Sequence, residues 1–148
     1  MITIQTKRIL FGLFLIFEMS NINALDNSKI ESDIGELAGS YYGSCMALSY
    51  LKQTYCPVIL IPSQNQCESN TLNALPPRFQ KLFLNLLKDT FITNGLTEIN
   101  HAIDVGFEKV LNMTNEDKDK ACFTYGTSLL TLNYQKLEEL KRTVKYVK

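Results

Sequence analysis

The apolar residues of this chain recur at steps of three and four, which is the period of an α-helix. Extended alternation with a period of two, which is typical of a half-buried β-strand, is absent from the sequence. Four amphipathic helices are predicted, with these limits: about Lys29 to Tyr55, Pro76 to Asn94, about Thr97 to Asn112, and Asn115 towards Lys148. Because the connections after the second and third helices are short, we expect an all-α fold, a small antiparallel four-helix bundle.

Residues that favour helix ends mark several of these limits. Pro76-Pro77 suits the first turn of the second helix, and Asn94-Gly95 is a typical C-terminal stop. Thr114 can cap the last helix, and Asp117 follows three residues later, where a capping box has its acid.

The first predicted helix carries a continuous apolar stripe with small residues beside it. The stripe consists of Ile30, Ile34, Leu37, Tyr41, Cys45, Leu48, Leu51 and Tyr55. The small residues are Ala38, Gly39, Gly43, Ser44 and Ala47. They either allow a neighbouring helix to approach closely or mark a kink, because glycine weakens a helix.

The connection between the first two helices, residues 57–76, is the least regular part of the sequence, and we predict a long loop tied by a disulfide. A stapled loop is pre-organised, so it loses less conformational entropy when it binds a partner. Its apolar run is therefore a candidate partner-binding epitope: Val58, Ile59, Leu60 and Ile61. A purely structural interpretation, a lid over the open end of the bundle, is favoured over this one.

The N-terminus has the layout of a secretory signal peptide. Lys7 and Arg8 form a basic region, the apolar run Ile9–Phe17 follows, and Ala24 stands where a signal peptidase would cut. The run is nine residues long, well short of the roughly 20 that span a bilayer. We expect residues 1–24 to be removed and residues 25–148 to form one helical domain, periplasmic or secreted. An uncleaved signal anchor is the alternative.

The expected domain contains four cysteines, Cys45, Cys56, Cys67 and Cys122. In an exported chain they indicate two disulfides, because a zinc site usually brings its ligands in close pairs. Cys45 and Cys56 are separated by roughly 16 Å along one helix, which excludes a bond between them. Two pairings remain. We predict Cys45–Cys122 through the core with Cys56–Cys67 across the loop; the other is Cys56–Cys122 with Cys45–Cys67.

Charge and candidate chemistry argue against several functions. The chain has 15 basic and 15 acidic residues, without the clustered basic face that a nucleic-acid partner requires. The single histidine lies in the series Glu98, His101, Asp104, but a di-metal site in a helical bundle requires a second such motif. We therefore expect no catalytic residue, no metal, no cofactor and no membrane contact beyond the signal peptide.

These observations favour an exported protein-binding module (an inhibitor, immunity-type or accessory factor) whose partner is another extracytoplasmic protein. The layout of leader, helical bundle and cysteines joining the first and last helices resembles that of small periplasmic immunity proteins, which neutralise type VI-secreted cell-wall amidases. The resemblance is architectural and rests on no diagnostic motif. The alternative is a carrier that holds a small apolar ligand in a cavity lined by Phe83, Leu87, Phe107 and Leu129.

Overall fold

The structure, a computed structural model, describes residues 25–57 and 64–146 and confirms the all-helical class for this part of the chain. The elements, in chain order, are the α-helices α2 (Leu25–Thr54), α3 (Gln64–Ala74), α4 (Pro77–Leu86) and α5 (Thr90–Glu108), the short 3-10 helix η2 (Val110–Asn112) and the α-helix α6 (Asn115–Val144). The first and last of these are the longest, with 30 residues each.

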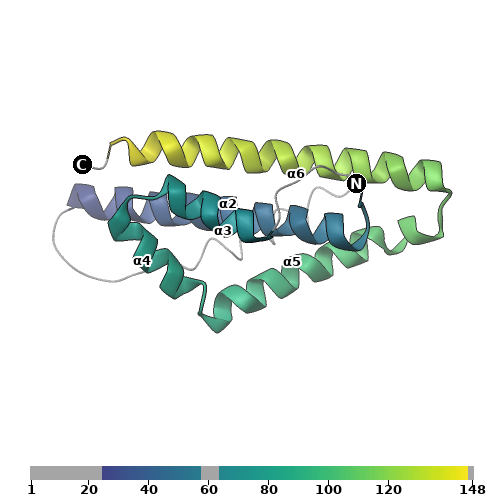
Figure 1. Cartoon of the computed structure of the whole chain (residues 1–148), viewed down its shortest axis with the longest axis horizontal. Helices are drawn as coiled ribbons and strands as arrows, with labels where there is room; N and C mark the ends of the chain where they lie inside the picture. Colours follow the sequence, from purple (N-terminus) through teal and green to yellow (C-terminus); the bar gives the residue numbers. More distant parts are fainter. Residues whose placement is uncertain (1–24, 58–63, 147–148) are drawn as a thin grey trace.

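Helices α2 and α6 lie side by side and run antiparallel over most of their length, and α6 extends beyond the end of α2 (Figure 1). A disulfide joins Cys56, just after α2, to Cys122 on α6. Eleven residues further along α6, the Asn133 side chain donates hydrogen bonds to the Tyr41 carbonyl (3.0 Å) and to the Ser44 hydroxyl (2.9 Å) of α2. These contacts fix the register of the pair.

Helix α2 is the central element, because neighbours cover it on several sides. Its predicted apolar stripe is buried or partly buried throughout, and Ile34, Cys45 and Leu48 have no exposed surface. The small residues beside the stripe are also buried or nearly so, among them Ala38, Ser44 and Ala47. Small side chains let adjoining helix backbones approach closely, which explains why this face accommodates both α3 and α6.

Two clusters of buried side chains make up the interior. The first, which we call the α3–α4 core, consists of Ile34, Ala38, Tyr42, Cys45, Cys67, Leu75, Phe79, Phe83 and Leu140. The second, the α5 core, consists of Leu51, Cys56, Phe107, Val110 and Cys122. The α3–α4 core therefore lies towards the start of α2, and the α5 core lies towards its end.

The expected loop after the first helix is largely helical, which corrects the prediction. Residues Gln64–Ala74 form α3, and Cys67 and Thr71 on its inner side have no exposed surface. The Thr71 hydroxyl donates to the Cys67 carbonyl at 2.7 Å. The polar composition of this segment masked a helix that buries only one narrow side, so the apolar period was too weak to read.

The boundary between the second and third predicted helices is also displaced. Helix α4 begins at Pro77 as expected but ends at Leu86, and α5 already begins at Thr90, so Asn94-Gly95 lies inside a helix. The chain turns between α4 and α5 because the two helices bury separate sets of side chains. Helix α4 buries Phe79 and Phe83, whereas α5 buries residues of its own. Asp89, of a type that favours the position before a helix, was the unused signal in the sequence.

The preferred disulfide pairing, Cys45–Cys122 with Cys56–Cys67, is wrong, and the other one is present. The Cα–Cα distance is 5.6 Å for Cys45–Cys67 and 5.5 Å for Cys56–Cys122. The prediction set the start of the last helix level with the end of the first. In the structure α6 extends beyond α2, so Cys56 lies level with Cys122, and Cys45 faces α3 instead.

The predicted cap of the last helix is confirmed. The Thr114 hydroxyl oxygen accepts a hydrogen bond from the Asp117 backbone N–H at 3.3 Å, and its own proton is donated to the Asp117 carboxylate at 2.7 Å. Acidic residues in the first turn and basic residues in the last complement the helix dipole. Local sequence chemistry therefore fixes where α6 begins.

The two disulfides are typical of an oxidising, extracytoplasmic environment. The segment expected to be a signal peptide, residues 1–24, lies outside the described residues. Within the part of the chain that is described, no helix combines the length and the hydropathy needed to cross a membrane.

Candidate functional site

The predicted epitope, Val58, Ile59, Leu60 and Ile61, lies outside the residues that the structure describes. The three residues of the series Glu98, His101 and Asp104 on α5 lie in different environments. Glu98 and His101 are exposed, whereas Asp104 is half-buried against α2. Over residues 25–57 and 64–146, no three histidine, cysteine, aspartate or glutamate side chains form a group that could hold a metal ion.

Asp104 accepts hydrogen bonds from two tyrosines of α2 and thereby ties α5 to α2. The Tyr50 hydroxyl donates to its carboxylate at 2.8 and 3.1 Å, and the Tyr55 hydroxyl donates at 2.6 Å. The Tyr55 ring also stacks on Phe107, with 5.0 Å between the ring centroids. The carboxylate is thus part of the structural contact between two helices.

The same carboxylate raises the pKa of both phenols. Loss of either hydroxyl proton would place a phenolate beside Asp104, so these hydrogen bonds are the main cause, with burial and further negative charge adding to it. The pKa of Tyr55 rises to about 12. Both phenols therefore keep their protons well above neutral pH and act as hydrogen-bond donors.

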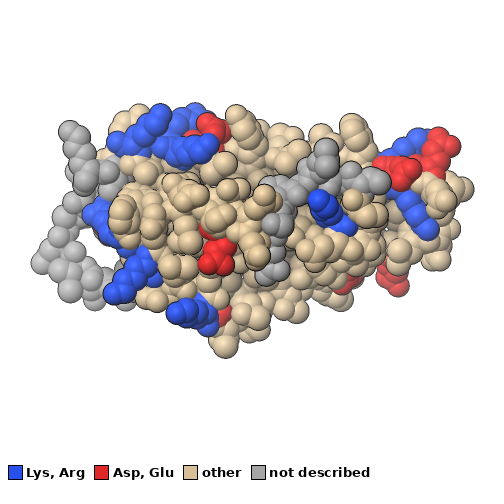
Figure 2. Space-filling model, viewed as in Figure 1, with Lys and Arg blue, Asp and Glu red and all other residues tan. Residues whose placement is uncertain are grey.

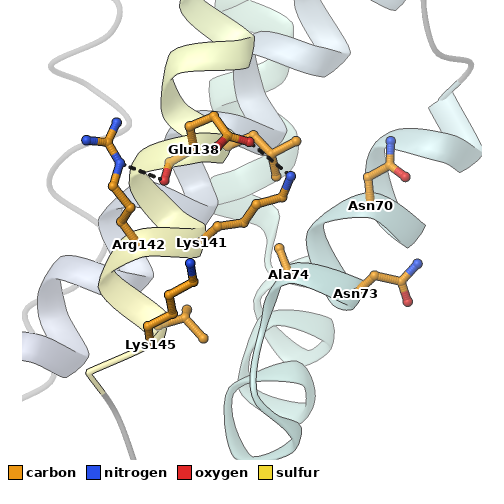
Figure 3. A pocket seen from close by; sticks show the side chains of 9 residues that line it. Asn70, Asn73, Ala74, Glu138, Lys141, Arg142 and Lys145 are labelled. Atoms are coloured by element: carbon orange, nitrogen blue, oxygen red, sulfur yellow. Dashed lines mark hydrogen bonds and ion pairs between the residues drawn. The ribbon is translucent and has the colours of Figure 1, made fainter.

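An open groove of about 500 Å³ lies between α3 and the C-terminal part of α6 (Figure 3). We call it the α3–α6 groove. One wall is formed by three residues of α3: Asn70, Asn73 and Ala74. The other wall is formed by six residues at the C-terminal end of α6: Leu137, Glu138, Lys141, Arg142, Val144 and Lys145. The α3 wall therefore contributes two amide side chains, and the α6 wall contributes three cations and one carboxylate.

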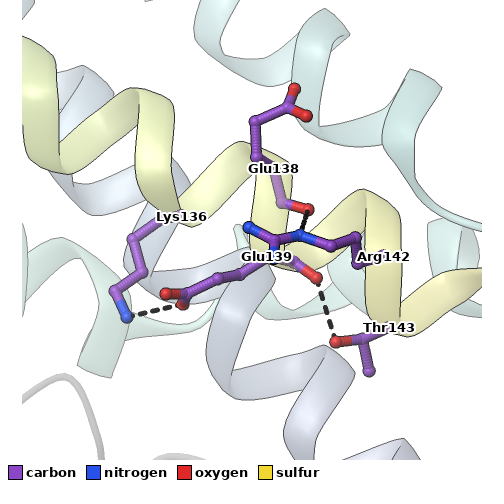
Figure 4. Close-up of polar contacts among 5 residues, drawn as sticks. All are labelled: Lys136, Glu138, Glu139, Arg142 and Thr143. Atoms are coloured by element: carbon purple, nitrogen blue, oxygen red, sulfur yellow. Dashed lines mark hydrogen bonds and ion pairs between the residues drawn. The ribbon is translucent and has the colours of Figure 1, made fainter.

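Contacts within α6 hold part of the groove wall in place. Glu138 accepts from the Lys141 ammonium at 3.0 Å, and its carbonyl accepts from Arg142 Nε at 3.3 Å (Figures 3 and 4). Lys136 and Glu139 form a second pair at 2.9 Å (Figure 4). Lys145 makes no ion pair with any residue of the described ranges. The α6 wall therefore carries a net positive charge.

A buried tyrosine links the two walls of the groove. Tyr41 is almost completely buried, and burial raises the pKa of its hydroxyl. A hydrogen bond from Asn70 and the positive charge of Lys141 act on this pKa in the opposite direction. The Tyr41 hydroxyl therefore lies close to one residue of each wall, and it connects the groove to the buried interior.

The outer side of α6 carries an exposed apolar stripe next to the groove. Phe123, Leu130 and Tyr134 are 74%, 42% and 65% exposed, and Thr127 is exposed between them. Their spacing of four, three and four residues places them on one side of the helix. No charged residue occurs from Ala121 to Gln135. We call this stripe the neutral face.

Charged residues flank the neutral face at both ends of α6. In Figure 2 the middle of the helix is free of charged side chains over the part of its surface that is visible, whereas both ends carry them. The N-terminal end, residues 115–120, has three acidic residues and two lysines, and the C-terminal end, residues 136–145, has four basic and two acidic residues. Along α6 the net charge therefore changes from −1 at the N-terminal end, through an uncharged middle, to +2 at the C-terminal end beside the groove.

The four residues predicted to line a ligand cavity do not meet. Phe83 belongs to the α3–α4 core and Leu87 packs against it, while Phe107 belongs to the α5 core and Leu129 packs against that one. Each therefore packs against its own cluster.

Sequence reasoning missed the neutral face because it assigned α6 a single apolar stripe, Cys122, Tyr125, Leu129, Leu132, Leu140 and Val144. The structure buries that stripe wholly or partly. The remaining apolar residues, Phe123, Leu130 and Tyr134, repeat at the same spacing on another side. The signal was present: a stretch without charged residues on a helix that buries only one face indicates a second covered face.

The chain matches no known protein family, no curated protein and no solved structure.

Proposed function

We propose that this protein is an exported protein-binding module that docks a partner along the outer side of α6. The observation that carries the proposal is the neutral face, three large apolar side chains exposed in line on one helix. Tyrosine and phenylalanine are enriched at the centres of protein interfaces. Contiguous exposed apolar side chains are a common mark of interaction sites in soluble proteins.

The α3–α6 groove supports the proposal by adding polar specificity at one end of the neutral face. Its cations and amide groups offer hydrogen bonds to carboxylates of a partner segment. Interfaces commonly combine an apolar centre with a charged rim, which sets orientation and association rate. A partner with apolar side chains and acidic residues at one end would match this surface.

The scaffold also supports binding, because it keeps the surface rigid. One disulfide holds α3 against α2, and the other holds α6 against the end of α2. A surface ordered before binding loses less entropy in the complex. The expected biological role remains that of an inhibitor, immunity-type or accessory factor acting on another extracytoplasmic protein. The carrier alternative gains no support, since its four lining residues belong to separate cores.

A capture experiment tests the proposal. The full chain, exported with its own N-terminal segment, carries a C-terminal tag and is used in oxidised form against the extracytoplasmic extract of its source. We expect one stoichiometric partner, which the double variant Phe123→Glu/Tyr134→Glu fails to retain. The control is Leu82→Glu/Val105→Glu, which changes two other exposed apolar residues (44% and 53% exposed) on α4 and α5.

Three outcomes have distinct meanings. Loss of the partner in the α6 variant alone supports the proposed docking surface. Loss of the partner in both variants would indicate non-specific binding through exposed apolar residues. Retention of the partner in both variants would reject the α6 surface. Circular dichroism and thermal unfolding of both variants show whether the fold is intact.

A further inference from the structure

We infer that a second copy of this chain fits the same surface, with two α6 helices packed antiparallel around a twofold axis. The inference rests on the proposed function, since it takes the outer side of α6 as a docking surface and names one occupant for it. Twofold interfaces are the commonest in soluble oligomers, and each requires a patch that is complementary to itself. The outer side of α6 has this property.

The first argument is the spacing of the exposed residues. Phe123, Thr127, Leu130 and Tyr134 follow one another at steps of four, three and four, which is the seam of a helix that packs along a second helix. Pairing around a midpoint between Thr127 and Leu130 sets Phe123 opposite Tyr134 of the second copy. It also sets Thr127 opposite Leu130. The large exposed side chains would thereby cover one another.

The second argument is the charge distribution along α6. In the same register, Glu116 of one copy lies opposite Lys141 of the other, and the twofold axis repeats this pair. Residues 115–120 have a net charge of −1 and residues 136–145 have a net charge of +2, so antiparallel packing brings opposite charges together at both ends. Parallel packing would bring like ends together. The charges therefore select one orientation.

The third argument is continuity with the α3–α6 groove. Lys141 belongs both to the seam and to the groove wall, and Figure 3 shows its side chain extending from α6 towards α3. The N-terminal end of the second α6 would enter the groove at this point. Because one surface serves both uses, self-association and the capture of another protein compete. Partner binding then requires dissociation of the dimer.

The test measures mass as a function of concentration for the full chain, exported with its own leader and purified in oxidised form. In sedimentation velocity or light scattering we expect the mass to rise from one chain to two. Phe123→Glu should raise the dissociation constant by at least ~100-fold, because it buries two unpaired carboxylates in the dimer. Val105→Glu on α5 should leave it unchanged. A mass of one chain at every accessible concentration would overturn the inference.

A charge exchange tests the antiparallel register. Glu116→Lys and Lys141→Glu should each raise the dissociation constant roughly three- to tenfold, because each variant opposes like charges at two places in the dimer. The double variant Glu116→Lys/Lys141→Glu restores opposite charges and should return the constant close to its original value. Additive weakening in the double variant would reject this register.

The results for self-association and for capture are read separately. A monomeric protein that still loses its partner through Phe123→Glu/Tyr134→Glu would reject the second copy while retaining the proposed function. A dimer that dissociates through Phe123→Glu, together with partner capture that is indifferent to the same substitution, would support the second copy and reject the partner-binding surface.

Discussion

The two cores of this protein differ in how they are closed. In the α3–α4 core, the disulfide Cys45–Cys67 joins residues separated by 22 positions, and Tyr42 packs edge-to-face on Phe83. In the α5 core, the disulfide Cys56–Cys122 spans 66 positions, and Phe107 lies between two other aromatic rings. The first bond joins two helices that follow one another in the sequence, α2 and α3, whereas the second joins the segment just after α2 to the last helix, α6.

This difference indicates which contacts hold the outer side of α6 in place. The α5 core positions the N-terminal part of α6, including Phe123, and the α3–α4 core positions the C-terminal part beside the groove. Next to the Cys45–Cys67 disulfide, Asn133 makes polar contacts with Tyr41 and Ser44 that anchor the middle of α6 to α2. The candidate docking surface is therefore supported at three heights along the helix.

The largest expected effect comes from opening the disulfides one at a time. Replacing Cys56 and Cys122 by alanine should lower the free energy of unfolding by ~4 kcal/mol, and replacing Cys45 and Cys67 by ~3 kcal/mol, because the longer loop restricts the unfolded chain more. Urea unfolding of both double variants measures the two values. A larger loss for the shorter loop would show that packing, rather than chain entropy, dominates.

The polar contact between α6 and α2 is tested by Asn133→Ala. This substitution removes two buried hydrogen bonds, to the Tyr41 carbonyl and to the Ser44 hydroxyl, and leaves the carbonyl only the bond from the Ser44 hydroxyl at 2.9 Å. We therefore expect a loss of roughly 1–3 kcal/mol in unfolding free energy. The control is Gln135→Ala, an exposed position two residues away on the same helix, for which a change within about 0.5 kcal/mol is expected. Equal effects of the two substitutions would contradict an anchoring role for Asn133.

The smallest expected effect is a loss of folding stability at alkaline pH, which arises from Tyr55 beside the α5 core. The folded state holds the phenol proton of Tyr55 up to a pKa of about 12, against an ordinary value of 10.0. This contribution to stability is complete below pH 10 and is lost as the pH rises from 10 towards 12. In Asp104→Asn the acceptor is neutral, so the pKa of Tyr55 should fall back towards 10.0.

Ultraviolet titration of tyrosinate absorbance measures this shift, with Glu98→Gln on the exposed side of α5 as the control. An unchanged late-titrating tyrosine in Asp104→Asn would show that burial, and not the carboxylate, keeps the proton in place. In the α3–α4 core, by contrast, the pKa of Tyr42 is raised chiefly by burial, with the negative charge of Glu68 adding to it.

The sequence by itself determined the helical class and the ends that depend on local chemistry. The apolar period located α2 and α6, Pro77 set the start of α4, and Thr114 set the start of α6. The buried stripe of α2 was also predictable, because a helix must bury its apolar side. Distance along the helix excluded the bond between Cys45 and Cys56. All of these depend on residues close together in the chain.

Only the tertiary structure decided the features that depend on how helices are offset from one another. The extension of α6 beyond α2 selected Cys56–Cys122 over Cys45–Cys122, and an offset between two helices leaves no mark in the period of either. Helix α3 exists because Cys67 and Thr71 are buried against α2, although its own sequence is polar. The neutral face likewise became visible only when packing had used the other side of α6, since a helix pattern does not say which of two apolar stripes the core will cover.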